Sequence, residues 1–326
     1  MRIGNILSSA KEIKFGETQG SILGPLLFII YVNDLPQYMN DGLLVQYADD
    51  ILILLTGDIG DLETLKTRAE MILDKARRYF NFNGLLLNEN KTQCIFLGAW
   101  QYISRIPDDM KIVFNNNELT PQKHIKNLGV HMDCCMTFNT HINELHNKLM
   151  GILLYLNRIT KRFDKESRKL VVQSLVLSIL NYGLRVWGSA NKTNILKVQR
   201  LQNFAGKVAV GGARKRDHAS PIIRSLKWLC MDKKYIYEIC ILIFKVKAHE
   251  TPEWLFELQT ASEVRGAAVT TRQNNHLFIP RTRTNYGGRN LYVEGPRIWN
   301  SLPDDIMNCQ SLSCFKRKLF NHLSQQ

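Results

Sequence analysis

The hydrophobic and polar positions in the first part of the chain predict a β-hairpin preceded by a helix. Two apolar runs, Leu43 to Tyr47 and Ile51 to Leu55, flank the polar step Ala48-Asp49-Asp50, which is typical of two strands joined by a tight turn. Before them, Gly20 to Tyr31 is an apolar stretch opened by Gly-Ser, and it predicts a loop that runs into a buried helix.

A long amphipathic helix is predicted after the hairpin. Asp61 stands at its N-cap position and Gly84 at its end. Its apolar residues recur at helical spacing: Leu62, Leu65, Ala69, Ile72, Leu73, Ala76 and Phe80. Two more apolar runs, Leu85 to Leu87 and Cys94 to Leu97, predict further strands. This β–α–β order implies an α+β layer in which a helix covers one face of a sheet.

The second part of the chain reads as mostly helical. One stripe comprises Ile142, Leu145, Leu149, Ile152, Leu153, Leu156 and Ile159. Two apolar-rich helices follow at Leu170 to Leu180 and Ile195 to Val208, and Gly211-Gly212 predicts a break. Beyond the break we expect a helix over Lys233 to Lys247, a polar Arg-rich tract over 265–297, and a final helix around 312–323.

Charge separates the two parts more sharply than hydropathy does. The 326 residues are 45% hydrophobic and 22% charged, which excludes disorder throughout, and the net charge is +14. Residues 1–130 carry a net charge of −2 and residues 131–326 a net charge of +16. A strongly basic half predicts contact with phosphates of nucleic acid or of an anionic membrane, and a solvated basic surface is the alternative.

The chain shows no sequence feature of a membrane or secreted protein. Its longest apolar run, Ile22 to Val32, is about half as long as a membrane-spanning helix. The N-terminus lacks the pattern of a secretory signal, and seven scattered cysteines fit a reducing compartment better than a disulfide framework. We therefore expect an intracellular protein, with nucleus and cytoplasm both open, no membrane contact and no protein partner indicated.

Adjacent acids at a hairpin turn are the sharpest chemical feature. Asp49 and Asp50 lie between apolar strands, where two carboxylates are costly unless a cation neutralises them. Nucleotidyl transfer uses two Mg²⁺ ions about 3.5–4 Å apart, and Mg²⁺ prefers a few carboxylates together with substrate phosphates. Spacing alone leaves a plain polar turn as the commoner interpretation of an Asp-Asp pair.

Four strings in one order decide between these interpretations. Tyr47-Ala48-Asp49-Asp50 resembles the metal-binding hairpin of reverse transcriptases, and GETQGSILGPLLFIIYVNDLP (16–36) resembles their template- and nucleotide-contacting segment. GLLLNENKTQCIFLG (84–98) is similar to the next motif, and HIKNLGVHMD (124–133) to the turn that grips the primer end. The sequence of segment 16–36 resembles that of non-LTR retrotransposon polymerases of the jockey-like kind. The same resemblance extends to YGLRVWG (182–188) and RTNYGGRNLYVEGPRIWNSLPDDI (283–306).

The resemblance implies the C-terminal portion of an RNA-directed DNA polymerase, a nucleotidyltransferase. Its fold would be α+β: a truncated right-hand polymerase palm over 1–130, a mostly helical thumb-like region over 131–210, and a basic C-terminal region over 211–326. The implied cofactor is Mg²⁺ in a two-ion site, and the implied partners are an RNA template, a DNA primer and deoxynucleoside triphosphates.

Individual roles follow from the same resemblance. Asp49 and Asp50 would bind the metal, and Lys91 would stabilise or protonate the leaving pyrophosphate. Gln19 and Gly20 would lie against the nucleotide and the templating base, since a residue without Cβ allows close approach of the backbone. Tyr47 and Ala48 would lie beside the nucleotide or primer terminus. For Gly20 a plain helix-opening glycine, for Tyr47 a core position and for Lys91 a surface lysine are the structural alternatives.

The resemblance also implies that one ligand is missing. The family's first metal-binding aspartate lies upstream of the Gln-Gly segment, where this sequence has Glu12 and Glu17 and no aspartate. We therefore expect a truncated and inactive copy. The alternatives are a non-catalytic nucleic-acid-binding remnant that uses only the basic half, and a fragment without function.

Candidate phosphate contacts lie in the basic half. Three of them, Lys197, Arg200 and Lys207, are on the exposed side of the predicted helix 195–208. The others are Arg214, Lys215 and Arg216, and the arginines between 281 and 297, all in polar segments.

Overall fold

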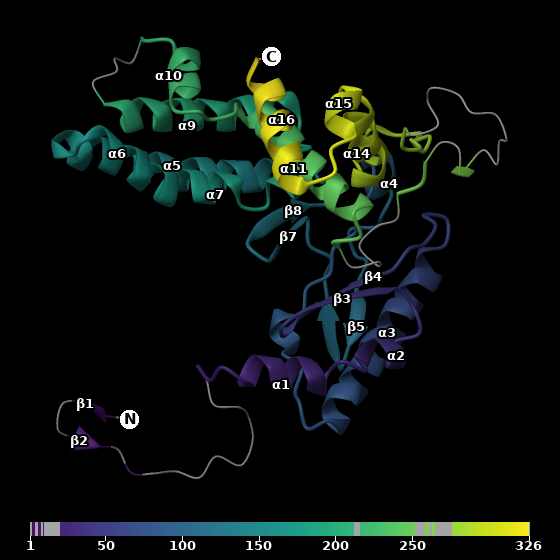
Figure 1. The fold of residues 1–326 in the computed structure, drawn as a ribbon. Helices are drawn as coiled ribbons and strands as arrows, with labels where there is room; N and C mark the ends of the chain where they lie inside the picture. The colour runs from purple at the N-terminus through teal and green to yellow at the C-terminus, as the bar shows by residue number, and fades with distance from the viewer. Residues whose placement is uncertain are drawn as a thin grey trace. The chain divides into compact units, whose positions relative to one another are not determined.

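The computed structural model describes residues 2–3, 6–7, 9, 20–211, 216–251, 258–260, 263–264 and 276–325. Its backbone divides into two compact units, of which unit 1 is Met1–Gln93 with Ile106–Pro121 and unit 2 is Cys94–Arg105 with Gln122–Gln326. Figure 1 shows the helices and strands of both. Helices and strands are mixed, which confirms the α+β class.

Unit 1 combines antiparallel two-stranded hairpins with helices. Its strands are β1 (Arg2–Ile3), β2 (Ile6–Leu7), β3 (Leu43–Tyr47), β4 (Asp50–Leu54), β5 (Ile112–Phe114) and β6 (Asn117–Leu119), paired β1–β2, β3–β4 and β5–β6. Its helices are α1 (Gly24–Tyr31), α2 (Leu35–Tyr38), α3 (Leu62–Phe82) and the 3₁₀ turn η1 (Glu89–Lys91). The predicted hairpin at 43–55 is confirmed.

Helix α3 has the ends that the sequence predicts. The Asp61 carboxylate accepts a hydrogen bond from Thr64 N–H at 3.3 Å, which caps the first turn. At the other end Gly84 has φ +67°, its N–H donates to Asn81 O, and Leu85 N–H donates to Phe80 O. This pair of bonds is a Schellman motif, which favours glycine at the left-handed position.

The core of unit 1 lies between α3, α2 and one face of the β3–β4 hairpin. Its buried residues are Val32, Leu35, Met39, Ile72, Ala76, Tyr79 and Phe80. Half-buried Leu44, Ile51 and Ile53 pack against them from the hairpin. Here the expectation that a helix covers one face of strand structure is confirmed.

Three expectations about this part of the chain are wrong. No strand forms at Leu85 to Leu87 or at Cys94 to Leu97. In the described residues only isolated backbone hydrogen bonds join these runs to other residues, and neither run has a continuous partner strand. Gly98 N–H donates to Cys134 O and Gln122 N–H to Cys94 O, and no ladder continues from either bond.

The helix expected to be buried is instead exposed. Most of α1 faces solvent, with Leu26, Leu27, Ile29, Ile30 and Tyr31 each about half exposed or more. A helix without a polar face reads as buried from sequence alone, yet within the described residues only Phe28 of α1 packs against the core.

Unit 2 is mostly helical. It begins with α4 (Trp100–Ile103) and the hairpin of β7 (His124–Asn127) and β8 (Val130–Asp133). The helices that follow are α5 (Asn139–Ile159), η2 (Thr160–Arg162), α6 (Lys165–Val172), the π-helical turn η3 (Gln173–Leu177), α7 (Ser178–Asn181), α8 (Leu184–Trp187), α9 (Lys192–Val210), α10 (Ala219–Ser225), α11 (Met231–Lys247), α13 (Asn285–Gly288), α14 (Leu291–Asn300), α15 (Asp304–Met307) and α16 (Leu312–Gln325).

The helices predicted in this part are confirmed. The stripe of α5 is buried from Ile142 to Leu156 at core spacing, while Ile159 at its end is 40% exposed. The apolar run 170–180 forms α6, η3 and α7 in succession, and α9 ends at Gly211 with φ +73°. Of the Arg-rich tract, residues 265–275 lie outside the described residues and the remainder includes α13 and α14.

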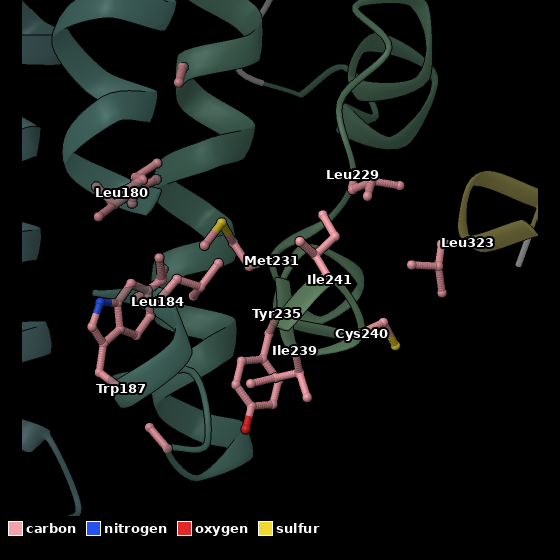
Figure 2. Packing of buried hydrophobic residues seen from close by; sticks show 14 of the residues in the cluster. Leu180, Leu184, Trp187, Leu229, Met231, Tyr235, Ile239, Cys240, Ile241 and Leu323 are labelled. Carbon is pink, nitrogen blue, oxygen red and sulfur yellow. The ribbon is translucent and has the colours of Figure 1, made fainter. Parts of the chain in front are cut away.

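One hydrophobic core joins most of the described helices of unit 2. It extends from Val130 and Phe138 to Leu319 and Leu323, so residues of 131–210 and of 211–326 are buried in the same cluster. Figure 2 shows part of it, with Leu180, Leu184 and Trp187 on one side of Tyr235 and Ile239. None of the described helices is both long enough and apolar enough to cross a membrane.

Candidate active site and nucleic-acid interface

The Asp49-Asp50 pair lies at the turn of the β3–β4 hairpin. Tyr47 pairs with Asp50, so Ala48 and Asp49 form a two-residue turn. Ala48 has φ +51°, a left-handed conformation that a residue with Cβ seldom adopts. Along the strands, Leu44 and Ile53 point to the core, whereas Tyr47 and its partner Asp50 lie on the opposite, exposed face.

Both carboxylates are open to solvent and free to bind a cation. In the described part of the chain, neither Asp49 nor Asp50 uses its side chain in a hydrogen bond or an ion pair. Their oxygens are the hard ligands that Mg²⁺ prefers, and an ion held by two carboxylates would complete its shell with water or phosphate oxygens. The described residues contain no group of three or more His, Cys, Asp or Glu placed to hold a metal ion.

The base of the hairpin is fixed by an ion pair. The Arg68 guanidinium of α3 donates to both oxygens of Asp41, at 2.6 and 2.8 Å, and to Thr56 O at 2.8 Å. Asp41 precedes β3 and Thr56 follows β4, so one arginine ties both hairpin ends to the helix. The hydrogen bond from Arg68 holds the pKa of the Asp41 carboxyl below its ordinary value.

The first predicted contact segment is described only from Gly20. Gly20 is exposed with φ +81°, and a side chain built there would meet no atom within 4 Å. Its backbone angle therefore favours glycine, while the described residues do not crowd it. Gln19 lies outside the described residues.

Lys91 lies on the short turn η1, which the Glu89 carboxylate attaches to the β5–β6 turn. It ends η1 and is exposed, and no hydrogen bond or ion pair joins it to Asp49 or Asp50 in the described residues. The Glu89 carboxylate accepts from Asn115 Nδ2 and Asn117 Nδ2 at 2.5 and 2.6 Å, which attaches η1 to the β5–β6 turn. Tyr47, 65% exposed, is not a core residue.

The basic residues of α9 differ in accessibility. Arg200 is exposed, whereas Lys197 is half-buried and donates to Asn143 Oδ1 on α5. Lys207 is also half-buried, and Arg216 is exposed in the turn that precedes α10. Arg214 and Lys215 lie outside the described residues.

The YGLRVWG string anchors the β7–β8 hairpin, a role that sequence reasoning did not assign. Tyr182 Oη donates to Leu128 O in the hairpin turn at 2.6 Å, and Trp187 Nε1 donates to Tyr182 O at 2.8 Å. Gly183, with φ +64°, approaches Val130 so closely that a Cβ would lie 2.8 Å from Val130 Cγ2. The spacing of aromatic residue and glycine was the available signal, but its partner lies more than fifty residues away.

Comparison with known proteins shows what this chain is similar to. Residues 2–132 match the model of the reverse transcriptase (RNA-dependent DNA polymerase) family. A probable RNA-directed DNA polymerase from transposon BS of Drosophila melanogaster is 29% identical over 63% of this chain and 23% of its own length. The RNA-directed DNA polymerase from mobile element jockey of Drosophila funebris is 27% identical over 60% of this chain and 22% of its own length. The chain is thus similar to the reverse transcriptases of non-LTR retrotransposons, which confirms the resemblance that its motifs indicate.

The similarity extends beyond the matched residues. A retrovirus-related Pol polyprotein from type-1 retrotransposable element R1 of Nasonia vitripennis is 27% identical over 69% of this chain and 68% of its own length. The chain spans less than a quarter of the length of the BS and jockey polymerases. No solved structure matches it.

Proposed function

We propose that this chain is the part of a retrotransposon RNA-directed DNA polymerase that carries the metal-binding hairpin. The observation that supports it most directly is the Asp49-Asp50 pair, exposed and without a partner at the turn of β3–β4, inside the residues that match the family. The substrates would be an RNA template, a DNA primer and deoxynucleoside triphosphates. In this assignment residues 1–130 correspond to palm, 131–210 to a thumb-like region and 211–326 to a basic C-terminal region.

Each candidate site residue would have its own role in nucleotidyl transfer. Asp49 and Asp50 would hold Mg²⁺, which when bound lowers the pKa of an attacking hydroxyl and neutralises phosphate charge. Gly20 would admit the backbone close to the nucleotide, with Gln19 beside it, and Ala48 would leave room at the primer terminus next to Tyr47. The exposed Lys91 ammonium would stabilise or protonate the departing pyrophosphate.

We propose further that the 326-residue chain, assayed by itself, does not polymerise. Its first aspartate is Asp34, and the Tyr79 hydroxyl donates to the carboxylate of Asp34. A metal site with only Asp49 and Asp50 as carboxylate ligands would lack the third carboxylate that the resemblance implies. Loss of such a ligand costs on the order of a thousandfold or more in rate.

Primer extension on an RNA template tests both statements. With Mg²⁺ and deoxynucleotides we expect no template-dependent product from the chain alone. Mn²⁺, a paramagnetic substitute for Mg²⁺, should broaden NMR signals at the hairpin turn, and the Asp49→Asn/Asp50→Asn variant should abolish that broadening. Absence of broadening in the unaltered chain would remove the metal-binding proposal, whereas extension that disappears in Asp49→Asn would refute the proposed inactivity.

A second function, nucleic-acid binding without catalysis, is favoured by the charge distribution. The net charge of +16 lies in residues 131–326, whereas the aspartate pair belongs to residues 1–130. This function requires no metal at the hairpin. Binding of an RNA–DNA duplex that is unchanged in the double-asparagine variant, together with no metal-dependent broadening, would support it over the first.

A further inference from the structure

A cationic pocket lies in the C-terminal region, among the arginines between 281 and 297 that the sequence offers as phosphate contacts. It has a volume of about 490 Å³ and lies within unit 2, formed by α13, α14 and the residues just before α13. Its lining comprises Thr282, Arg283, Thr284, Asn285, Gly288, Arg289, Glu294 and Arg297. Three arginines and one glutamate therefore line the same cavity, together with two threonines and an asparagine whose side chains can donate hydrogen bonds.

One of the three arginines is fixed in place. The guanidinium of Arg289 donates to Cys135 O at 3.0 Å and Met136 O at 3.2 Å, in the loop that follows the β7–β8 hairpin. That loop is itself held by the Asp133 carboxylate, which accepts from Thr137 N–H at 2.9 Å and Phe138 N–H at 2.6 Å. Because a guanidinium has five N–H groups, Arg289 retains donors for a ligand in the pocket.

The pocket wall is also ordered by side-chain caps. Thr284 Oγ1 accepts from Gly287 N–H at 3.1 Å, which leaves its own hydroxyl hydrogen to donate. Asn290 Oδ1 accepts from Tyr292 N–H at 3.0 Å at the start of α14. The wall is thus built before a ligand enters, which lowers the entropic cost of binding.

The other two arginines are available to an anion. Arg283 and Arg297 are exposed, and among the described residues no carboxylate lies within ion-pair distance of either. The carboxylate of Glu294 accepts from Tyr235 Oη at 3.2 Å, and burial raises the pKa of Glu294. The lining carries three arginines and one glutamate, so its net charge is positive whichever form Glu294 takes.

We propose that this pocket binds a phosphate of the nucleic-acid backbone. Planar guanidinium groups bind phosphate through paired hydrogen bonds, and neighbouring hydroxyl groups can donate to its remaining oxygens. Nucleic acid is the expected source because Arg289 joins the pocket to the loop after β7–β8, the hairpin that resembles a primer-gripping turn. That choice of source rests on the proposed function, whereas the anion chemistry of the pocket does not.

Fluorescence anisotropy of a labelled RNA–DNA duplex with the full chain tests the proposal. The variant Arg283→Gln/Arg297→Gln should weaken binding roughly tenfold or more at about 0.1 M salt. It should also reduce the slope of log K against log[salt] by about 0.9 for each phosphate that the variant no longer neutralises. The control Arg317→Gln/Arg105→Gln removes the same charge from exposed arginines of unit 2 outside the pocket and should change binding far less.

Each other outcome decides against the proposal. Equal weakening by both variants would mean that only the overall charge matters. Weaker binding of inorganic phosphate or a deoxynucleotide by the pocket variant, with unchanged duplex binding, would assign the pocket to a free phosphate compound instead. Urea unfolding should show both variants as stable as the unaltered chain, so that weaker binding is not a loss of fold. Metal-dependent broadening at Asp49 and Asp50 is unaffected by these variants, so the proposed polymerase role is tested separately.

Discussion

Gly188 is a position where one missing methyl group decides whether two helices can meet. A Cβ on it would lie 2.3 Å from Tyr235 Cδ2 and 2.4 Å from Leu184 O, both far inside van der Waals contact. The φ of Gly188 is −66°, an ordinary value at a helix end that any residue can adopt. Space rather than backbone conformation therefore requires glycine here, and the last letter of YGLRVWG is a packing residue.

The substitution Gly188→Ala should destabilise unit 2. We expect a loss of about 1–3 kcal/mol in the free energy of unfolding, because the Tyr235 ring or α8 must move. Urea unfolding measures it. The matched control is Gly151→Ala on α5, where a Cβ meets no atom within 4 Å, and which should stabilise the helix by about 0.5–1 kcal/mol. Equal effects of the two substitutions would show that the close approach at Gly188 does not exist in solution.

A pH effect is expected at Glu294. Burial raises its pKa in the folded chain above the ordinary value of 4.5, so the unfolded chain ionises first as pH rises. The contribution of Glu294 to stability is therefore fully present below about pH 4.5 and is lost as pH rises through the raised pKa. The variant Glu294→Gln should have a smaller stability loss over that interval, measured by urea unfolding from pH 4 to 8. A difference between variant and parent that does not change with pH would contradict the assignment.

At the scale of elements, the β3–β4 hairpin is the least supported structure that carries candidate chemistry. It is two-stranded, and its outer face exposes Leu43, Leu52 and Leu54. Isolated hairpins of this kind are marginally stable in water, and their free edges invite pairing with another chain. Its support comes from the inner face on α3 and from the Arg68–Asp41 ion pair.

Hydrogen exchange should separate this hairpin from the helices of unit 2. We expect amides of residues 43–55 to lose protection well before those of residues 142–180, because α5 buries a full stripe and the hairpin only one face. The measurement is amide exchange followed by mass spectrometry of the intact chain. If residues 43–55 were the best protected, the hairpin would have a partner on its outer face.

At the scale of the whole molecule, charge and chemistry are placed in different parts of the chain. The aspartate pair belongs to unit 1, and the shared core of unit 2 organises the basic residues. Because one core joins α5, α9, α11 and α16, a substitution in the last helix is expected to affect the helices near residue 150. The described helices of residues 131–210 and of residues 211–326 thus share one core.

Nucleic acid should bind mainly to this basic half. In the full chain, cross-links from an RNA–DNA duplex should fall in residues 131–326 and be sparse in residues 1–130, which carry a net charge of −2. Affinity should fall steeply with salt, with log K against log[salt] sloping by about −0.7 to −0.9 for each phosphate neutralised. Mass spectrometry locates the cross-links, and binding that is indifferent to salt would remove the electrostatic basis of the expectation.

The sequence by itself determined those features that depend on neighbours along the chain. The stripe of α5, the cap at Asp61, the glycine stop at Gly84 and the hairpin around Asp49 follow from spacing and turn chemistry, and the structure has them where they were expected. The order of four motifs likewise indicated the resemblance to reverse transcriptases. These signals are local, so burial elsewhere does not alter them.

Tertiary structure alone decided which surfaces are covered and which distant residues meet. The apolar helix α1 is exposed and Leu85 to Leu87 form no strand, because burial and strand pairing each need a partner that the local pattern does not name. Arg289 meets the loop after β8 across 153 residues, and Tyr182 meets the β7–β8 turn across 54. The residues next to a side chain in sequence do not show which distant residues it contacts. Only the folded chain therefore showed that the arginines line one cationic pocket.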